Sequence, residues 1–162
     1  MAQWTTSTQA NARPEHVLDV LTDPDAIRLW SPIDFDVEDL IPDASGGYPC
    51  HGVRLEAGTT ARVSGKLAGV RVGFDIEVHA ADEDGVELTA HGPIGIDVSY
   101  EIAPAAGGSE VTAAVSLRRG GGITGRLISQ ATAALLSAGA LDGAARGIAR
   151  AAETGPALAA AA

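Results

Sequence analysis

The sequence has little cysteine, few aromatic residues and few positive charges. Cys50 is the only cysteine, so no internal disulfide can form and the cysteine content gives no indication of secretion. Lys and Arg number 11 against 21 Asp and Glu, a formal net charge of -10. Because an acidic surface repels phosphate groups, we expect no nucleic-acid partner. Residues 1–12 lack the basic and apolar regions of a signal peptide, and no uninterrupted apolar run reaches the roughly 18 residues of a membrane span. We therefore expect a cytoplasmic protein without a membrane span.

Apolar residues are plentiful, although most of them are small. They make up 46% of the 162 residues, whereas aromatic residues make up 4%, and alanine is abundant. A chain of this length is typical of one domain with a single core. We expect this domain over residues 1–154 and a low-complexity tail over residues 155–162. Small side chains fill little volume, so the elements must either approach closely or leave a space between them.

The order of the expected elements is one strand, two short helices, six strands and one long helix. Residues 3–9 alternate weakly, and Pro14 and Pro24 stand at typical first positions of helices that end near Thr22 and Trp30. Period-two alternation then predicts strands at residues 33–38, 61–67, 70–79, 86–91, 94–102 and 111–117. Turn residues separate successive strands, which predicts an antiparallel meander with one face in solvent.

Residues 123 to about 153 have helical periodicity. A single apolar stripe steps by four and three along this segment and should face the sheet; it comprises Leu127, Ala131, Ala134, Ala138, Leu141, Ala145 and Ile148. Gly139, Gly143 and Gly147 each lower helix propensity by roughly 1 kcal/mol relative to alanine. A helix that contains them should be held by packing, and glycine would allow a close approach.

This order of elements, with the segment PEHVLDVLTDP at residues 14–24 leading to Trp30-Ser31-Pro32, resembles the SRPBCC superfamily of START-like, helix-grip proteins. Within it the chain is similar to the polyketide cyclase/dehydrase group. Residues 61–70 and 141–149 are also similar to the G-type subunit of carbon monoxide dehydrogenase. The resemblance implies an α+β helix-grip fold, in which a curved seven-stranded antiparallel sheet wraps around a long C-terminal helix. It also implies two short helices between strands 1 and 2, and an apolar cavity between the sheet and the C-terminal helix.

The apolar parity of the strands should form the wall of that cavity. This parity carries no ionisable side chain other than Tyr100, whereas acid/base catalysis needs a titratable group within reach of the substrate. The pattern therefore favours binding over turnover, and no catalytic residue can be assigned. The predicted ligand-binding residues are Trp30, Phe35, Tyr48, Val63, Phe74, Ile96, Tyr100, Leu127, Ala131 and Leu135. Ser129 and Gln130 are further polar candidates at the cavity mouth.

Metal, cofactor and nucleophile chemistry have weak support in the sequence. Cys50 and His51 are neighbours in an extended segment, so their side chains should point in opposite directions. His79 and His91 fall on the outward parity, where Asp75, Glu77 and Glu87 are plausible cross-strand partners. The residues at 120–122 are glycines, but the Lys-Ser/Thr of a phosphate-binding loop is missing. We expect neither a metal nor a cofactor.

Three functions fit these observations. The first is binding of a hydrophobic small molecule, such as a polyketide-like aromatic, a lipid or a quinone, in the apolar cavity. The second is a polyketide aromatase/cyclase that positions its substrate in the same cavity. The third is a protein-interaction module, which a collapsed cavity and an exposed apolar patch would favour. The sequence allows either a monomer or a homodimer.

Overall fold

The structure, a computed structural model, describes residues 2–31, 35–41, 55–67, 70–118 and 121–161. Its elements follow in the order β1 (Ala2–Ala10), α1 (Pro14–Thr22), α2 (Pro24–Trp30), β2 (Phe35–Ile41), β3 (Thr60–Leu67), β4 (Val70–Asp82), β5 (Gly85–His91), β6 (Gly95–Ala105), β7 (Gly108–Arg118), α3 (Gly122–Ser137) and α4 (Ala140–Ala161). The α+β fold class is as the sequence predicts. The strands form one seven-stranded antiparallel sheet in the order β1-β7-β6-β5-β4-β3-β2.

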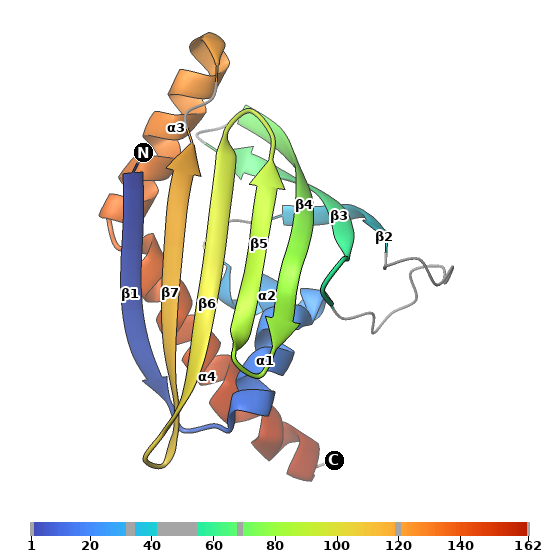
Figure 1. Cartoon of the computed structure of the whole chain (residues 1–162), viewed down its shortest axis with the longest axis vertical. Coiled ribbons are helices and arrows are strands. Elements are labelled where there is room, and N and C mark those ends of the chain that lie inside the picture. The colour runs from blue at the N-terminus through green and yellow to red at the C-terminus, as the bar shows by residue number, and fades with distance from the viewer. Residues whose placement is uncertain (1, 32–34, 42–54, 68–69, 119–120, 162) are drawn as a thin grey trace.

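All four helices lie on one side of this sheet (Figure 1). Helix α4 packs along β1 and also contacts α1 and α2. Two polar contacts fix its position, because the backbone N–H of Asn11 donates to Glu153 Oε1 at 2.9 Å and the Thr6 hydroxyl donates to Asp142. Between α4, α1 and the sheet lies a core of fully buried aliphatic residues that includes Val17, Ile148 and Val111.

The turns between long strands form at the predicted residues. The Asp82 carboxylate accepts the backbone N–H of Asp84 at 2.9 Å and that of Gly85 at 3.2 Å, which closes the turn between β4 and β5. Gly85 has a φ of 155°, and a Cβ at this position would lie 2.1 Å from the carbonyl oxygen of Tyr100. Only glycine fits there, because the turn brings β6 directly against its Cα.

The prediction of one long C-terminal helix is wrong, because the segment is divided into α3 and α4. Gly139 adopts a φ of 97°, and its N–H donates to the carbonyl of Leu136, while the N–H of Ala138 bonds the carbonyl of Ala134. A glycine in this left-handed conformation just after a helix is a common C-terminal cap. Helix α4 also extends to Ala161, beyond the predicted end near Glu153, in a segment rich in alanine, the best helix former.

The buried face of α3 also differs from the predicted stripe. Gly125, Ile128 and Thr132 are its buried residues, whereas Leu127 is 48% exposed and Ala134 is exposed. The true face is shifted by one residue, a rotation of about 100° around the helix axis. In α4 the stripe is correct, since its members Leu141, Ala145 and Ile148 are buried.

The charged parity of the strands faces away from the helices, as expected. Arg62 Nε lies 2.9 Å from Asp75 Oδ1, and Arg118 Nε lies 3.2 Å from Asp97 Oδ2. His91 Nε2 lies 3.9 Å from a carboxylate oxygen of Glu77, one of the predicted partners. These pairs cross neighbouring strands on the outer face of the sheet.

Candidate functional site

A cavity of about 300 Å³ lies between the inner face of the sheet and the helices. Its sheet wall consists mainly of aliphatic and aromatic side chains on β3 to β6. These strand residues are Ala61, Val63, Ser64, Gly65, Val72, Phe74, Ile76, Leu88, Ala90, Ile96, Val98 and Tyr100. Their inward direction follows from the alternation of side chains along each strand. The sheet therefore provides a broad apolar surface.

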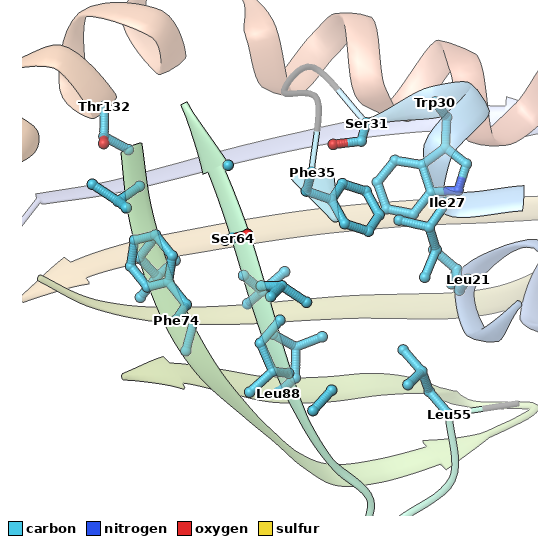
Figure 2. A pocket seen from close by; sticks show the side chains of 18 of the residues that line it. Leu21, Ile27, Trp30, Ser31, Phe35, Leu55, Ser64, Phe74, Leu88 and Thr132 are labelled. Carbon is cyan, nitrogen blue, oxygen red and sulfur yellow. The ribbon is translucent and has the colours of Figure 1, made fainter. Parts of the chain in front are cut away.

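The other wall comes from the short helices and the segments that flank them. Leu21, Ile27, Trp30, Ser31, Phe35 and Leu55 line this side, together with Thr132 from α3. Leu55 is held there because its backbone N–H donates to the carbonyl of Thr22 at 2.8 Å. Figure 2 shows Trp30, Ile27 and Phe35 grouped on one side of the cavity and Phe74 near Thr132 on the other.

Trp30 connects the helical wall to the sheet wall. Its indole N–H donates to the carbonyl of Val20 at 3.1 Å, which fixes the ring at the end of α2. The ring meets Tyr100 edge to face, with centroids 5.9 Å apart and an interplanar angle of 78°. Aromatic pairs prefer this geometry and gain about 0.5–1.5 kcal/mol beyond the area that they bury.

Tyr100 brings a polar group into the apolar wall. Its side chain is enclosed by protein, and this burial raises the pKa of the hydroxyl above its ordinary value. Within the described part of the chain the hydroxyl makes no hydrogen bond, while the oxygen that is fully enclosed without a partner is Ser129 Oγ. The Tyr100 oxygen thus retains accessible surface, and because the residue lines the cavity, we assign that surface to the cavity.

Other hydroxyl groups in the wall are already engaged. The Thr132 hydroxyl donates to the carbonyl of Ile128 at 2.8 Å, one turn earlier in α3. The Ser64 hydroxyl accepts a hydrogen bond from the Arg71 guanidinium at 3.2 Å. Ser31 has an interaction partner as well. These groups differ from Tyr100 in that their hydrogen-bonding capacity is partly used by the protein.

Six of the ten predicted ligand-binding residues line the cavity, namely Trp30, Phe35, Val63, Phe74, Ile96 and Tyr100. Leu127, Ala131 and Leu135 are not among the described lining residues, and Leu127 and Leu135 are 48% and 39% exposed. The one-residue shift in the face of α3 explains this difference. Tyr48 lies outside the described residues.

Several lining residues do not belong to the predicted ligand-binding set. Ala90, Leu88 and Val72 lie on the inward parity, so the alternation alone is a sufficient signal for them. Ile27 and Leu55 reach the cavity through the docking of short segments, for which the sequence has no periodic signal. The expected mouth residues Ser129 and Gln130 do not line the described cavity, and Gln130 is exposed.

Groups that could hold a metal or act as a nucleophile are not gathered in the described part of the chain. No cluster of three His, Cys, Asp or Glu side chains occurs among those residues. His79 Nε2 is 2.8 Å from the Thr89 hydroxyl on the outer face, so its partner is not one of the predicted carboxylates. Cys50 and His51 lie outside the described ranges. Among the described helices, none is long and apolar enough to cross a membrane.

A family model matches almost the whole chain. Residues 1–153 match the family described as "Polyketide cyclase / dehydrase and lipid transport". Among curated proteins, none matches this sequence. The family match covers every strand of the sheet and both short helices.

Solved structures with the same fold support this assignment at low sequence identity. Protein TTHA0849 from Thermus thermophilus is 18% identical, with a TM-score of 0.66 over 99% of this chain and 100% of that one. Protein CV1439 from Chromobacterium violaceum is 17% identical, with a TM-score of 0.60 over 90% and 96%. Ara h 8.0201 is 14% identical, with a TM-score of 0.55 over 94% and 95%. The likeness establishes the helix-grip fold that the sequence predicts.

Proposed function

Since the chain belongs to the polyketide cyclase/dehydrase and lipid transport family, we propose that it binds a hydrophobic small molecule in the cavity between its sheet and helices. The observation that carries the proposal is the cavity itself, a space of about 300 Å³ with an almost entirely apolar wall. Such a space is at the lower end of the range for small-molecule pockets, about 300–1,000 Å³. A compact aromatic polyketide, a quinone ring or a short lipid would suit it.

Affinity would come from apolar burial. Each 100 Å² of apolar ligand surface removed from water contributes about 2.5 kcal/mol, at about 25 cal/mol per Å². The aromatic rings of Trp30, Phe35 and Phe74 line the cavity and would supply flat surfaces for a ring-containing ligand. The described lining side chains carry no charge, so a bound apolar molecule would displace no strongly hydrated group from the wall.

The test is binding of N-phenyl-1-naphthylamine, an uncharged fluorescent probe. Ala90 is 7% exposed and lines the cavity at the centre of β5, so Ala90→Phe would place a ring in the space. We expect this variant to lose probe binding at least tenfold. Ala103→Phe is the matched control, because Ala103 is exposed on β6 and should leave binding unchanged.

A second measurement is native mass spectrometry, with organic extraction, of the protein purified from its own host. A reproducible apolar molecule that is present with the wild type and absent with Ala90→Phe would support the proposal. Equal probe binding by the wild type and Ala90→Phe, with nothing extracted, would refute it.

A second candidate, polyketide aromatase/cyclase activity, is favoured by the hydroxyl of Tyr100 in the same cavity. The cavity could hold a flexible substrate in a reactive conformation, and positioning alone can supply much of a rate enhancement. If the hydroxyl participates, Tyr100→Phe should change the distribution of cyclised products. An unchanged product distribution would exclude that role.

A further inference from the structure

The Tyr100 hydroxyl is the polar feature of the cavity that the protein leaves without a hydrogen bond in its described part. A buried hydroxyl without a partner costs roughly 1–3 kcal/mol relative to one that is hydrogen-bonded. Phenylalanine would avoid this cost and leave the apolar wall otherwise the same. The hydroxyl is therefore best understood as a group that a ligand completes.

The position of Tyr100 is well determined by its neighbours. Its backbone is paired with Val86 on one side and Ala113 on the other, in the middle of the sheet. Its ring lies against Trp30, and it packs against both buried clusters of the core. A side chain held in this way presents its hydroxyl in a fixed direction, so little conformational entropy is lost when a ligand binds.

The chemistry of this group selects the polar part of the ligand. A neutral phenol is a strong hydrogen-bond donor, and the raised pKa of Tyr100 keeps it protonated at neutral and mildly alkaline pH. Its natural complement is a carbonyl oxygen. An ionised carboxylate would be a poorer complement, because burial of a charge in an apolar wall costs far more than one neutral donor returns.

We propose that the cavity is specific for an uncharged, ring-sized apolar molecule that carries a ketone or quinone carbonyl, and that the Tyr100 hydroxyl donates a hydrogen bond to that oxygen. This inference rests on the proposed function of the cavity and narrows it. Tyr100 then acts as the specificity-determining residue, while the apolar wall supplies most of the affinity. Single-chain fatty acids and pure hydrocarbons would bind less well than ketones of the same size.

The experiment uses three probes of matched shape, 2-acetylnaphthalene, 2-ethylnaphthalene and 2-naphthoate. Their binding can be followed by calorimetry or by the fluorescence of Trp30, which lines the cavity. A net hydrogen bond is worth about a factor of three to ten in affinity. We expect the wild type to bind the ketone about three- to tenfold more tightly than 2-ethylnaphthalene, and 2-naphthoate more weakly than either. In Tyr100→Phe the preference for the ketone should disappear, while 2-ethylnaphthalene binds as before.

The three outcomes separate the inference from the proposed function. If 2-ethylnaphthalene and 2-acetylnaphthalene bind equally well to both proteins, or if 2-naphthoate binds as tightly as the ketone, the inference is overturned and the function survives. If none of the probes binds the wild type, both are overturned. Infrared spectroscopy of the bound ketone needs no variant, because a hydrogen bond lowers its carbonyl stretching frequency relative to that in hexane. An unshifted band would also overturn the inference.

Discussion

Gly147 of α4 lies directly against Trp30 of α2. A Cβ at position 147 would be 2.9 Å from the Cβ of Trp30 and 3.2 Å from its Cα. These atoms belong to the backbone and the root of the side chain, so they cannot move aside as the end of a flexible chain could. The close approach lets α4 support the tryptophan that closes the helical side of the cavity.

Gly147→Ala should therefore destabilise the protein although alanine is the better helix former. Overpacking of this kind costs about 1–3 kcal/mol, and the gain in helix propensity offsets roughly 0.5–1 kcal/mol of it. We expect a net loss of about 1 kcal/mol or more in the free energy of unfolding, measured by urea denaturation. Gly143→Ala is the control, because a Cβ there meets no atom within 4 Å. That variant should be as stable as the wild type or more stable; equal effects at both positions would contradict the close contact.

Replacement of Ser129 by alanine should stabilise the protein. The Ser129 hydroxyl oxygen is enclosed in α3 and has no hydrogen-bond partner in the described structure. Removal of an unsatisfied buried hydroxyl recovers about 1 kcal/mol or more. We expect Ser129→Ala to raise the free energy of unfolding by about that amount, and Ser137→Ala, at an exposed site on the same helix, to leave it within about 0.5 kcal/mol. A loss of stability in Ser129→Ala would show that the oxygen has a stabilising partner.

Tyr100 should make the stability of the protein sensitive to alkaline pH. Burial raises the pKa of its hydroxyl in the folded state, whereas an unfolded tyrosine has a pKa of about 10. Below about pH 10 both states hold the proton, so the stability is fully present. Above it the unfolded state loses the proton first, and the free energy of unfolding falls with rising pH, by up to about 1.4 kcal/mol per pH unit.

Urea denaturation of the wild type and Tyr100→Phe at about pH 9 and about pH 11 measures this effect. The wild type should lose about 1 kcal/mol more than the variant between the two conditions. The variant retains Tyr48 and every other titrating group, so the comparison isolates Tyr100. Parallel losses in the two proteins would mean that the Tyr100 hydroxyl titrates as in the unfolded chain.

The outer face gives a prediction that involves no change in the cavity. The Arg62 guanidinium donates a hydrogen bond to Asp75 at 2.9 Å and holds the pKa of that carboxyl below its usual range. Arg62→Gln should raise the Asp75 pKa, as measured by NMR titration of the carboxyl carbon, whereas Lys66→Gln on the same strand should not. Both partners are largely exposed, so solvent screens the pair and probe binding should not change. An unaltered Asp75 pKa in Arg62→Gln would contradict the pairing.

The strands and short helices could be predicted because their signals are local. Alternation located β3 to β7, and the prolines at positions 14 and 24 marked the starts of α1 and α2. The same parity rule identified the cavity residues Val63, Phe74 and Ile96 from the sequence alone. Patterns with a fixed period and a single buried face leave few alternatives.

The break between α3 and α4 escapes prediction because the apolar stripe continues across it in sequence. Leu127 to Ile148 step by four and three without interruption, so periodicity alone predicts one helix. Gly139 ends the helix through its positive φ, and the change of phase turns Thr132 rather than Ala131 toward the cavity. A glycine after a run of helical residues is a known stop signal, and here it is the local sign of the break.

The abundance of alanine does not explain the cavity in the way that the sequence suggested. An alanine stripe on the last helix was expected to leave space opposite the sheet, but Ala134 and Ala138 are exposed. In α4, Ala145 and Ala149 are buried and pack close to the first helices and β1. The cavity lies instead between the curved sheet and the end of α2, a tertiary arrangement that composition cannot predict.

Ligand binding inside the cavity is tested most directly by locating the contacts of an apolar ligand on the protein. The exposed residues Ile123 and Leu127 on α3 offer a surface alternative to the cavity, with 88% and 48% of their side chains exposed. Intermolecular NOEs between 2-ethylnaphthalene and methyl-labelled protein distinguish the two sites. We predict NOEs to the methyl groups of Ala90 and Val98 inside the cavity, and their loss in Ala90→Phe. NOEs confined to Ile123 and Leu127 would contradict binding in the cavity.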